Sequence, residues 1–303
     1  MAKTRIVTLD LNFRGRPRAI ASYLIRSGDA VILIESGPGS TLSSLEAGLR
    51  NEGLSPLDVT HVLLTHIHLD HAGAAGWLAA QAAGAEIYVH PVGAPHMLNP
   101  EKLIASATRI YGDRMESLWG EFLPVPEHQL KVPKDAEPIH IGNAEFIPLH
   151  TPGHAEHHYA YLFEDIVFCG DVGGVRIPGY RYLRVPMPPP ELHIERWRES
   201  ITRLRAAKPV RIAPTHFGIY DDPEWQLDEV ENGLNSAARW LEGVMASDPS
   251  IEELRGAFTE WMITEGERAG LSEEVMEAYE LANPPGMSAD GLMRYWKKVK
   301  HVG

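Results

Sequence analysis

The chain has 303 residues, 44% of them hydrophobic, which is enough for one large domain or for one domain with an appendage. Its 41 acidic residues outnumber 28 basic ones, and the formal net charge of −13 repels phosphate backbones, so we expect no nucleic-acid partner. Cys169 is the only cysteine, which excludes an intrachain disulfide. No apolar run reaches the length of a membrane span, so we expect a cytoplasmic protein without a membrane partner.

Apolar segments predict several strands in the first 65 residues. Residues 5–9 are typical of a strand, and residues 21–26 and 30–34 predict a hairpin. Ser40 is a candidate cap for a helix that ends near residue 51, because leucines recur there at helical spacing. The apolar run 62–64 predicts a further strand, which ends directly before a group of polar residues.

This polar group, residues 65–71 (THIHLDH), contains four potential metal ligands. In an extended segment side chains alternate between faces, so His66 and His68 project in the same direction and can bind one cation together. Asp70 and His71 follow where the chain turns into a small-residue helix, and the bend can direct this pair toward a second cation. Asp70 alone would pass for a helix N-cap, but clustered ligands between a strand and a helix predict half of a two-metal site.

Strand patterns recur in the second half of the chain, at residues 138–141, 144–149, 159–163, 166–169 and 210–213. Gly142-Asn143 is a typical two-residue hairpin turn between the first two of them. His154, Asp171 and His216 each come just past a strand end. We therefore expect these side chains to converge on one edge of the sheets, where rigid elements can hold a preorganised site.

The segment 175–190 is a loop rich in arginine, tyrosine and proline. Its candidate substrate-binding residues are Arg176, Tyr180, Arg181, Tyr182 and Arg184. An acidic protein that concentrates arginines beside Asp171 can use them to recruit an anionic substrate group. The alternative interpretation is a rigid connector with solvated arginines, because loops carry both roles.

Beyond residue 221 the pattern changes to helices without strand signals. An apolar seam runs through the first of these helices at Val230, Leu234, Ala237, Leu241 and Val244. This narrow seam predicts a face that packs on the rest of the chain, with a homodimer interface as the alternative. We therefore predict a catalytic domain over residues 1–221 and a helical region over residues 222–303.

The THIHLDH segment and three later motifs together resemble the signature of the metallo-β-lactamase superfamily. The later motifs are TPGH at residues 151–154, CGD at residues 169–171 and PTHFG at residues 214–218. The resemblance covers about residues 1–220. It implies an α+β fold, a four-layer αβ/βα sandwich of two mixed β-sheets flanked by helices, here with a C-terminal helical extension.

The resemblance also implies a ligand set. One metal would be held by His66, His68 and His154, the second by Asp70, His71 and His216, and Asp171 would bridge them. Imidazole and carboxylate donors suit two divalent cations, with zinc as the first choice and iron or manganese as alternatives.

Two positions concern the support of these ligands. The family usually has an aspartate where Glu35 stands, in a position that supports the site, so the hydrogen bonding of the longer side chain is an open question. The family often keeps an acidic residue at the position of Asp58, where it orients a ligand histidine.

The implied chemistry is hydrolysis. Two cations lower the pKa of a shared water, and we expect the resulting hydroxide to attack a polarised carbonyl, with Asp70 as the catalytic residue that orients it. The spacing of the motifs and the helical C-terminal region look most like the glyoxalase II (hydroxyacylglutathione hydrolase) branch. This resemblance implies a thioesterase that acts on a small molecule, and a lactonase is the second choice. A persulfide dioxygenase with one iron is the alternative from another class. A flavodiiron oxidoreductase and a noncatalytic scaffold are weaker candidates.

Overall fold

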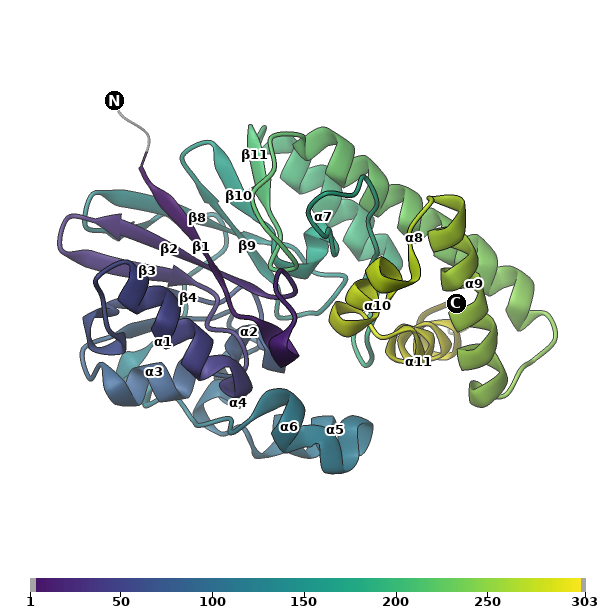
Figure 1. Cartoon of the computed structure of the whole chain (residues 1–303), viewed down its shortest axis with the longest axis horizontal. Helices are drawn as coiled ribbons and strands as arrows, with labels where there is room; N and C mark the ends of the chain where they lie inside the picture. Colours follow the sequence, from purple (N-terminus) through teal and green to yellow (C-terminus); the bar gives the residue numbers. More distant parts are fainter. Residues whose placement is uncertain (1–3, 301–303) are drawn as a thin grey trace. The chain divides into compact units, whose positions relative to one another are not determined.

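The computed structural model describes residues 4–300 (Figure 1). In this part of the chain two compact units are distinguished, and each is formed by two stretches of sequence. The first unit holds the residues up to 150 together with 157–169, and the second holds 151–156 and the residues from 170 onward. The predicted boundary between residues 221 and 222 therefore falls inside the second unit, just before a helix that begins at Pro223.

Among residues 4–300, the sheet at the N-terminal end has six strands in the order β1-β2-β3-β4-β5-β6, all in the first unit. Their bounds are β1 (Ile6–Asp10), β2 (Ala21–Ser27), β3 (Ala30–Ile34), β4 (His61–Leu63), β5 (Glu86–Tyr88) and β6 (Leu130–Lys131). Strands β1 to β3 pair antiparallel, which confirms the predicted hairpin, and β3 to β6 pair parallel. Parallel neighbours require crossover connections, and helices in the intervening segments supply them.

The helices of the first unit are α1 (Leu42–Asn51), α2 (Leu69–Ala72), α3 (Ala75–Gln81), α4 (Ala94–Leu98), α5 (Glu101–Tyr111) and α6 (Met115–Trp119). Helix α1 packs on β1 and α3 packs on β5. The helix predicted to end near residue 51 is confirmed, but the predicted Ser40 cap is wrong. Ser40 Oγ donates to the carbonyl of Leu118 at 2.6 Å, and the helix begins after Thr41 without a capping hydrogen bond from that side chain.

A second group of strands in the first unit pairs antiparallel in the order β10-β9-β8-β7. The bounds are β7 (Ile139–Ile141), β8 (Ala144–His150), β9 (Tyr159–Phe163) and β10 (Ile166–Phe168). The hairpin predicted at Gly142-Asn143 is confirmed. Gly142 has φ +60°, and a Cβ there would lie 2.2 Å from the carbonyl oxygen of Ser27, so both the turn and the close approach require glycine.

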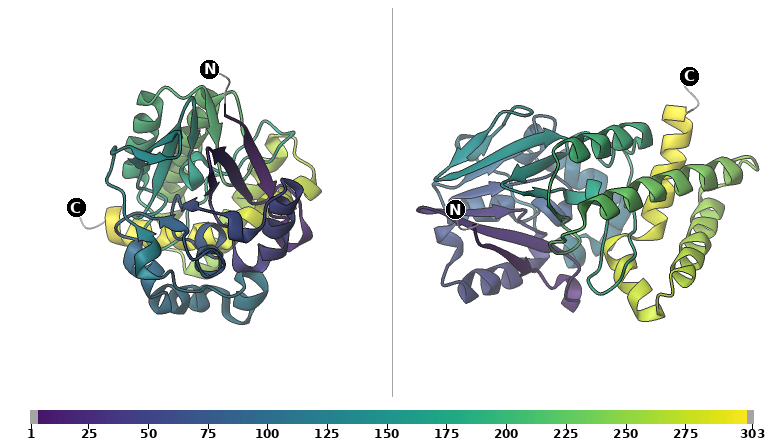
Figure 2. Two further views of the ribbon diagram at one scale, coloured as in Figure 1. Left: turned by 90° about the vertical axis from the view of Figure 1, so that its left-hand side faces the viewer. Right: turned by 90° about the horizontal axis from the view of Figure 1, so that it is seen from above.

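The second unit contains β11 (Arg211–Ala213) and the helices α7 (Ile194–Ala206), α8 (Pro223–Met245), α9 (Ile251–Arg268), α10 (Glu273–Ala282) and α11 (Pro285–Tyr295). The chain reverses direction between α8 and α9 (Figure 2). The seam of α8 is buried at Val230, Leu234, Ala237 and Leu241, and α8 packs against α7. None of the helices within residues 4–300 combines the length and the apolar character that crossing a bilayer requires.

One histidine pair lies apart from the predicted ligands. His90 Nε2 lies 2.9 Å from His150 Nδ1, and the two rings stack with centroids 4.9 Å apart. Tyr159 packs its ring 4.5 Å from that of His90. Burial and, to a lesser extent, the charge of His150 lower the pKa of His90 to about 4, and Asp135 partly opposes both effects. A depressed pKa means that the folded state resists protonation of His90.

This pair predicts a pH dependence of stability. As the pH falls from about 6.5 toward about 4, the unfolded chain takes up a proton at His90 while the folded chain does not, so the free energy of unfolding falls in that window. We expect His90→Gln to make the loss of stability between pH 7 and pH 5 smaller than in the wild type, measured by urea unfolding at both pH values. The exposed His128, changed to Gln, is the matched control, and equal pH dependence in the wild type and H90Q would contradict the prediction.

Candidate metal centre

The segment that carries the first predicted ligands is tied to the neighbouring strand β9. Tyr161 Oη donates to the carbonyl of Leu64 at 3.1 Å, and the backbone N–H of Tyr159 donates to that of Thr65 at 2.7 Å. His68 is in extended conformation and forms the N-cap position of the short helix α2. Strand β4 ends at Leu63, before the ligand segment, and the chain enters α2 within it at Leu69, as the predicted turn into a helix requires.

The structure brings the four ligand candidates of this segment together within the first unit. His66 Nε2 lies 2.9 Å from His68 Nδ1, with the two rings at 80°. His71 Nε2 lies 3.7 Å from Asp70 Oδ1, and the His66 and His71 ring centroids are 3.9 Å apart. His66 and His71 are fully buried, whereas the Asp70 side chain is 18% exposed.

Glu35 is the residue that organises this group. It is fully buried, its φ of +68° is unusual for a non-glycine residue, and such strain is concentrated at functional sites. Its carboxylate accepts hydrogen bonds from Thr65 N at 3.1 Å, from Thr65 Oγ1 at 2.5 Å and from His71 Nδ1 at 2.9 Å. With Nδ1 engaged by Glu35, Nε2 is the atom that His71 offers to a metal.

The acidic residue expected to orient a ligand histidine does not do so. Asp58 is exposed and accepts hydrogen bonds from the backbone N–H of Ser55 at 2.7 Å and from its hydroxyl at 2.8 Å. These hydrogen bonds lower the pKa of Asp58. Asp58 therefore caps a local turn, the expectation for it is wrong, and Glu35 supplies the orienting contact.

Further side chains lie close to the first ligand group. The rings of His157 and His158 lie 6.0 and 5.1 Å from that of His66. Tyr111 lies at the end of α5. Burial and the charge of Asp70 raise the pKa of its phenol, so Tyr111 lies in the field of that carboxylate. Only the folding of α5 over the ligand segment reveals this, since the two are 41 residues apart.

The second unit carries the other predicted ligands, arranged around Asp171. Asp171 Oδ2 lies 3.4 Å from His154 Nε2, and Oδ1 lies 3.5 Å from His216 Nε2. Two atoms bound to one metal at about 2.1 Å with tetrahedral geometry stand about 3.4 Å apart. Each oxygen–nitrogen pair therefore has the spacing of two ligands of one metal, and each oxygen faces a different histidine. This geometry fits a carboxylate that bridges two metals.

The backbone of the second unit fixes both of these histidines. His154 Nδ1 donates to the carbonyl of Pro186 at 2.9 Å, which makes Nε2 the atom it offers to a metal. Gly153 has φ +132°, and a Cβ there would lie 2.4 Å from Trp197 Cα in α7, so only glycine fits before His154. The carbonyl of His216 accepts a hydrogen bond from the backbone N–H of Arg176 at 2.5 Å.

The guanidinium of Arg176 is held by the chain itself. It donates to both carboxylate oxygens of Asp222, at 2.6 and 2.9 Å, and to Gln226 at 3.1 Å, and the contacts with Arg176 lower the pKa of Asp222. It also lies over the rings of Tyr220 and Trp225, 3.8 and 4.3 Å from their centroids. Such contacts are those of a structural arginine. A substrate role for Arg176 thus gains no support from its surroundings.

The other loop candidates differ in exposure. Tyr180 and Arg181 are exposed, Tyr182 is half-buried and Arg184 is only 1% exposed. Their substrate roles stay predictions.

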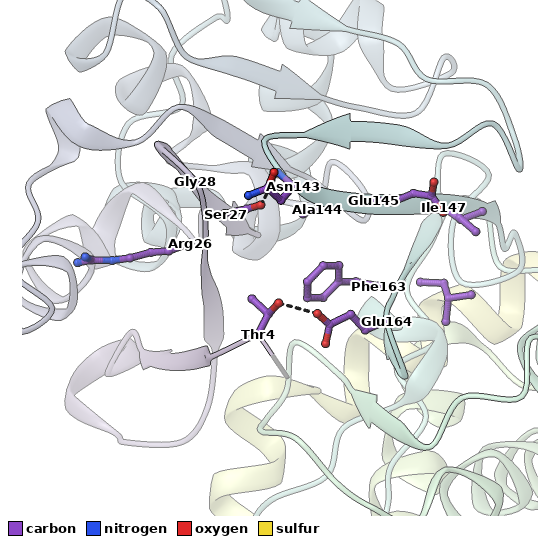
Figure 3. A pocket seen from close by; sticks show the side chains of 11 residues that line it. Thr4, Arg26, Ser27, Gly28, Asn143, Ala144, Glu145, Ile147, Phe163 and Glu164 are labelled. Atoms are coloured by element: carbon purple, nitrogen blue, oxygen red, sulfur yellow. Dashed lines mark hydrogen bonds between the residues drawn. The ribbon is translucent and has the colours of Figure 1, made fainter. Parts of the chain in front are cut away.

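A pocket in the first unit, beside the end of β2, is lined by none of the predicted site residues (Figure 3).

Comparison with known proteins identifies relatives. The profile of the Metallo-beta-lactamase superfamily matches residues 15–216. The metallo-beta-lactamase fold-containing protein ST1585 of Sulfurisphaera tokodaii is 25% identical over 67% of this chain and 74% of its own. The atrochrysone carboxyl ACP thioesterase of Aspergillus fumigatus is 24% identical over 68% of this chain, but the match spans only 39% of that protein.

Solved structures show the fold. The metallo-beta-lactamase family protein TTHA1429 of Thermus thermophilus superposes with a TM-score of 0.70 and 18% identity, covering 97% of this chain and 93% of that one. The archaeal protein ST1585 superposes with a TM-score of 0.61, 22% identity and coverage of 76% and 86%. These likenesses confirm the predicted architecture of two mixed sheets flanked by helices with further C-terminal helices.

The contacts of Glu35 generate a prediction. Glu35→Gln keeps the shape but removes the charge that holds His71, so we expect metal affinity to fall by about 10- to 100-fold, measured by competition with a chelating dye. Glu35→Ala leaves the donors of Thr65 and His71 without this acceptor, and each costs about 1–3 kcal/mol of stability. The exposed Glu101, changed to Gln, is the control. Unchanged affinity in E35Q would show that Glu35 does not orient a ligand.

Proposed function

The chain belongs to the metallo-β-lactamase superfamily, and on that premise we propose that it is a two-metal hydrolase that cleaves a thioester or ester bond of a small molecule. One metal would be held by His66, His68 and His154. The other would be held by Asp70, His71 and His216, with Asp171 shared between them. This assignment follows the order of the family's ligand motifs, and both ligand groups supply atoms that suit zinc, iron or manganese.

The geometry around Asp171 carries the proposal. Its two oxygens stand at 3.4 and 3.5 Å from two different imidazole nitrogens, longer than usual hydrogen bonds and equal to the spacing of ligands around a metal. A carboxylate that served only to orient one histidine would place one oxygen at hydrogen-bond distance, as Glu35 does with His71. Asp171 therefore supports a centre with two metals rather than one.

Two divalent cations in this centre would lower the pKa of a shared water and polarise a carbonyl oxygen. The side chains of the site would then orient the water and hold the metal ligands in place. Asp70 is the more exposed carboxylate of the ligand set, 18% against 6% for Asp171, so it can accept a hydrogen bond from the attacking water and orient it. His71 and His216 are buried, and Glu35 holds the imidazole of His71.

Among hydrolases, a thioesterase is our first choice. A curated relative is itself described as an acyl carrier protein thioesterase, although the match covers the smaller part of that protein. The resemblance to the glyoxalase II branch points to the same bond, a thioester whose leaving group is a thiol. Lactones are the second substrate class to examine, because the same attack on a carbonyl opens them.

The direct test is a hydrolysis panel of short acyl thioesters, matched oxygen esters and lactones with the metal-loaded protein. We expect Asp171→Asn to lower kcat/KM by about a hundredfold or more and to lower the bound metal as well, because the amide cannot bridge two cations. The exposed Asp248, changed to Asn, is the matched control and should behave as the wild type. Full activity with full metal content in D171N would refute the assignment of Asp171.

A further inference from the structure

Arg184 is a buried cation without an acidic partner. Its side chain is 1% exposed and forms a side-chain hydrogen bond with the neutral phenol of Tyr182, and within residues 4–300 no carboxylate pairs with it. The neighbouring Arg176 is also buried but is paired with Asp222 and Gln226. The charge of Arg176 is thus balanced by a carboxylate, whereas the charge of Arg184, in the same loop, is not. Burial of an unpaired charge is unfavourable, and natural proteins retain it mainly where it has a function.

The surroundings of Arg184 are aromatic and apolar. Its guanidinium carbon lies 5.4 Å from the ring centroid of Tyr279, and its charge opposes the rise that burial causes in the pKa of Tyr182, whose phenol is a neutral group. Tyr279 belongs to a buried cluster with Val175 and residues of α10. Glu265, an acidic group whose charge acts on Tyr182, is itself paired with Arg268 at 2.7 Å. In a medium of low polarity, an anion that paired with Arg184 would be held strongly.

Arg184 lies on the segment that fixes the ligands of the second unit. Its backbone forms a two-way bridge with Val175, which follows four residues after Asp171. Two residues further along, the carbonyl of Pro186 accepts the hydrogen bond from His154. The backbone of Arg184 is therefore hydrogen-bonded to the segment that follows Asp171 and lies two residues from the carbonyl that holds His154.

We propose that Arg184 binds a carboxylate of the substrate, which narrows the substrate class to thioesters or esters that carry a second, anionic end. This rests on the proposed hydrolase function. The planar guanidinium fork matches a carboxylate with two parallel hydrogen bonds. Because the overall charge of −13 repels anions, a local buried cation is needed to hold one.

Access to Arg184 requires a movement of the loop beside it. The hydroxyl of Tyr279 accepts a hydrogen bond from the backbone N–H of Ile177 at 3.2 Å and donates to the carbonyl of Tyr182 at 2.8 Å. These two hydrogen bonds connect Tyr279 to both ends of the segment 177–182. The middle of that segment, at Gly179, Tyr180 and Arg181, is exposed. On this proposal the two hydrogen bonds of Tyr279 would break when the carboxylate binds to the guanidinium.

The binding test compares succinate with the uncharged succinamide as ligands of the metal-loaded protein, by thermal shift and calorimetry. We expect succinate to stabilise the wild type, and Arg184→Met to weaken succinate binding roughly tenfold or more while succinamide binding is unaffected. R184M should also be at least as stable as the wild type without ligand, because it removes an unpaired buried charge. Arg239→Met, an exposed arginine of α8, is the control.

Arg184→Lys is the second variant, and its succinate affinity tests the proposal if R184M does not fold. Lysine keeps the charge but loses the fork, so its succinate affinity should lie below that of the wild type. Succinate binding that is the same in R184M, or in R184K, as in the wild type would overturn the proposal, since it would then come from the metals alone. Absence of any succinate effect on the wild type would overturn it as well.

A kinetic experiment distinguishes failure of the carboxylate proposal from failure of the proposed hydrolase function. The substrates are two thiophenyl esters of equal length, one ending in a carboxylate and one in a methyl group. We expect R184M to raise KM for the charged ester only. If neither ester nor any thioester is cleaved, the hydrolase assignment fails while the succinate titration still reports on Arg184. If both esters are cleaved with equal KM and R184M changes neither, the carboxylate proposal fails and the hydrolase assignment stands.

Discussion

Two buried carboxylates lie against the histidines on which the proposed centre depends, and they contact these histidines in different ways. An ionised carboxylate inside a protein is stable only when donors or cations compensate its charge. Glu35 is compensated by Thr65 and His71, so it can fix the imidazole of His71 before any metal binds. Asp171 instead keeps two imidazole nitrogens at the spacing of metal ligands. On the proposed assignment, Glu35 would orient a ligand and Asp171 would itself be a ligand.

The ligand segment and the hairpins could be predicted from sequence because local rules determine them. The helix that begins after His68 and the turn at Gly142 follow from small residues and a positive φ. His66 and His68 lie beyond the end of β4, but their imidazoles face each other as the predicted alternation requires. Ser40 was assigned wrongly from a local pattern, and Asp58 from the place of an acidic residue in the family. Short polar side chains accept several partners, and neither kind of signal indicates which partner the folded chain selects.

The hydrogen-bond partners that hold the site residues could not be predicted, because they lie far from those residues in the sequence. Glu35 meets His71 across 36 residues, and Arg176 meets Asp222 across 46. The sequence places Arg176 and Arg184 together as candidate anion-binding residues, yet the folded chain neutralises the first and leaves the second buried among aromatic rings. Both arginines lie in one loop, and only the folded chain shows that Arg176 is paired with Asp222 whereas Arg184 contacts Tyr182 and Tyr279.

The stoichiometry of bound metal tests the two-metal centre most directly. The protein would be purified without chelator and without added metal from cells grown with zinc, iron and manganese, and its metals measured by elemental analysis against protein concentration. The bridging geometry of Asp171 and the order of the family's ligand motifs predict two metal ions per chain. One iron per chain, with no second ion taken up when metal is supplied, would contradict the hydrolytic centre and would direct attention to oxygen consumption with a persulfide substrate.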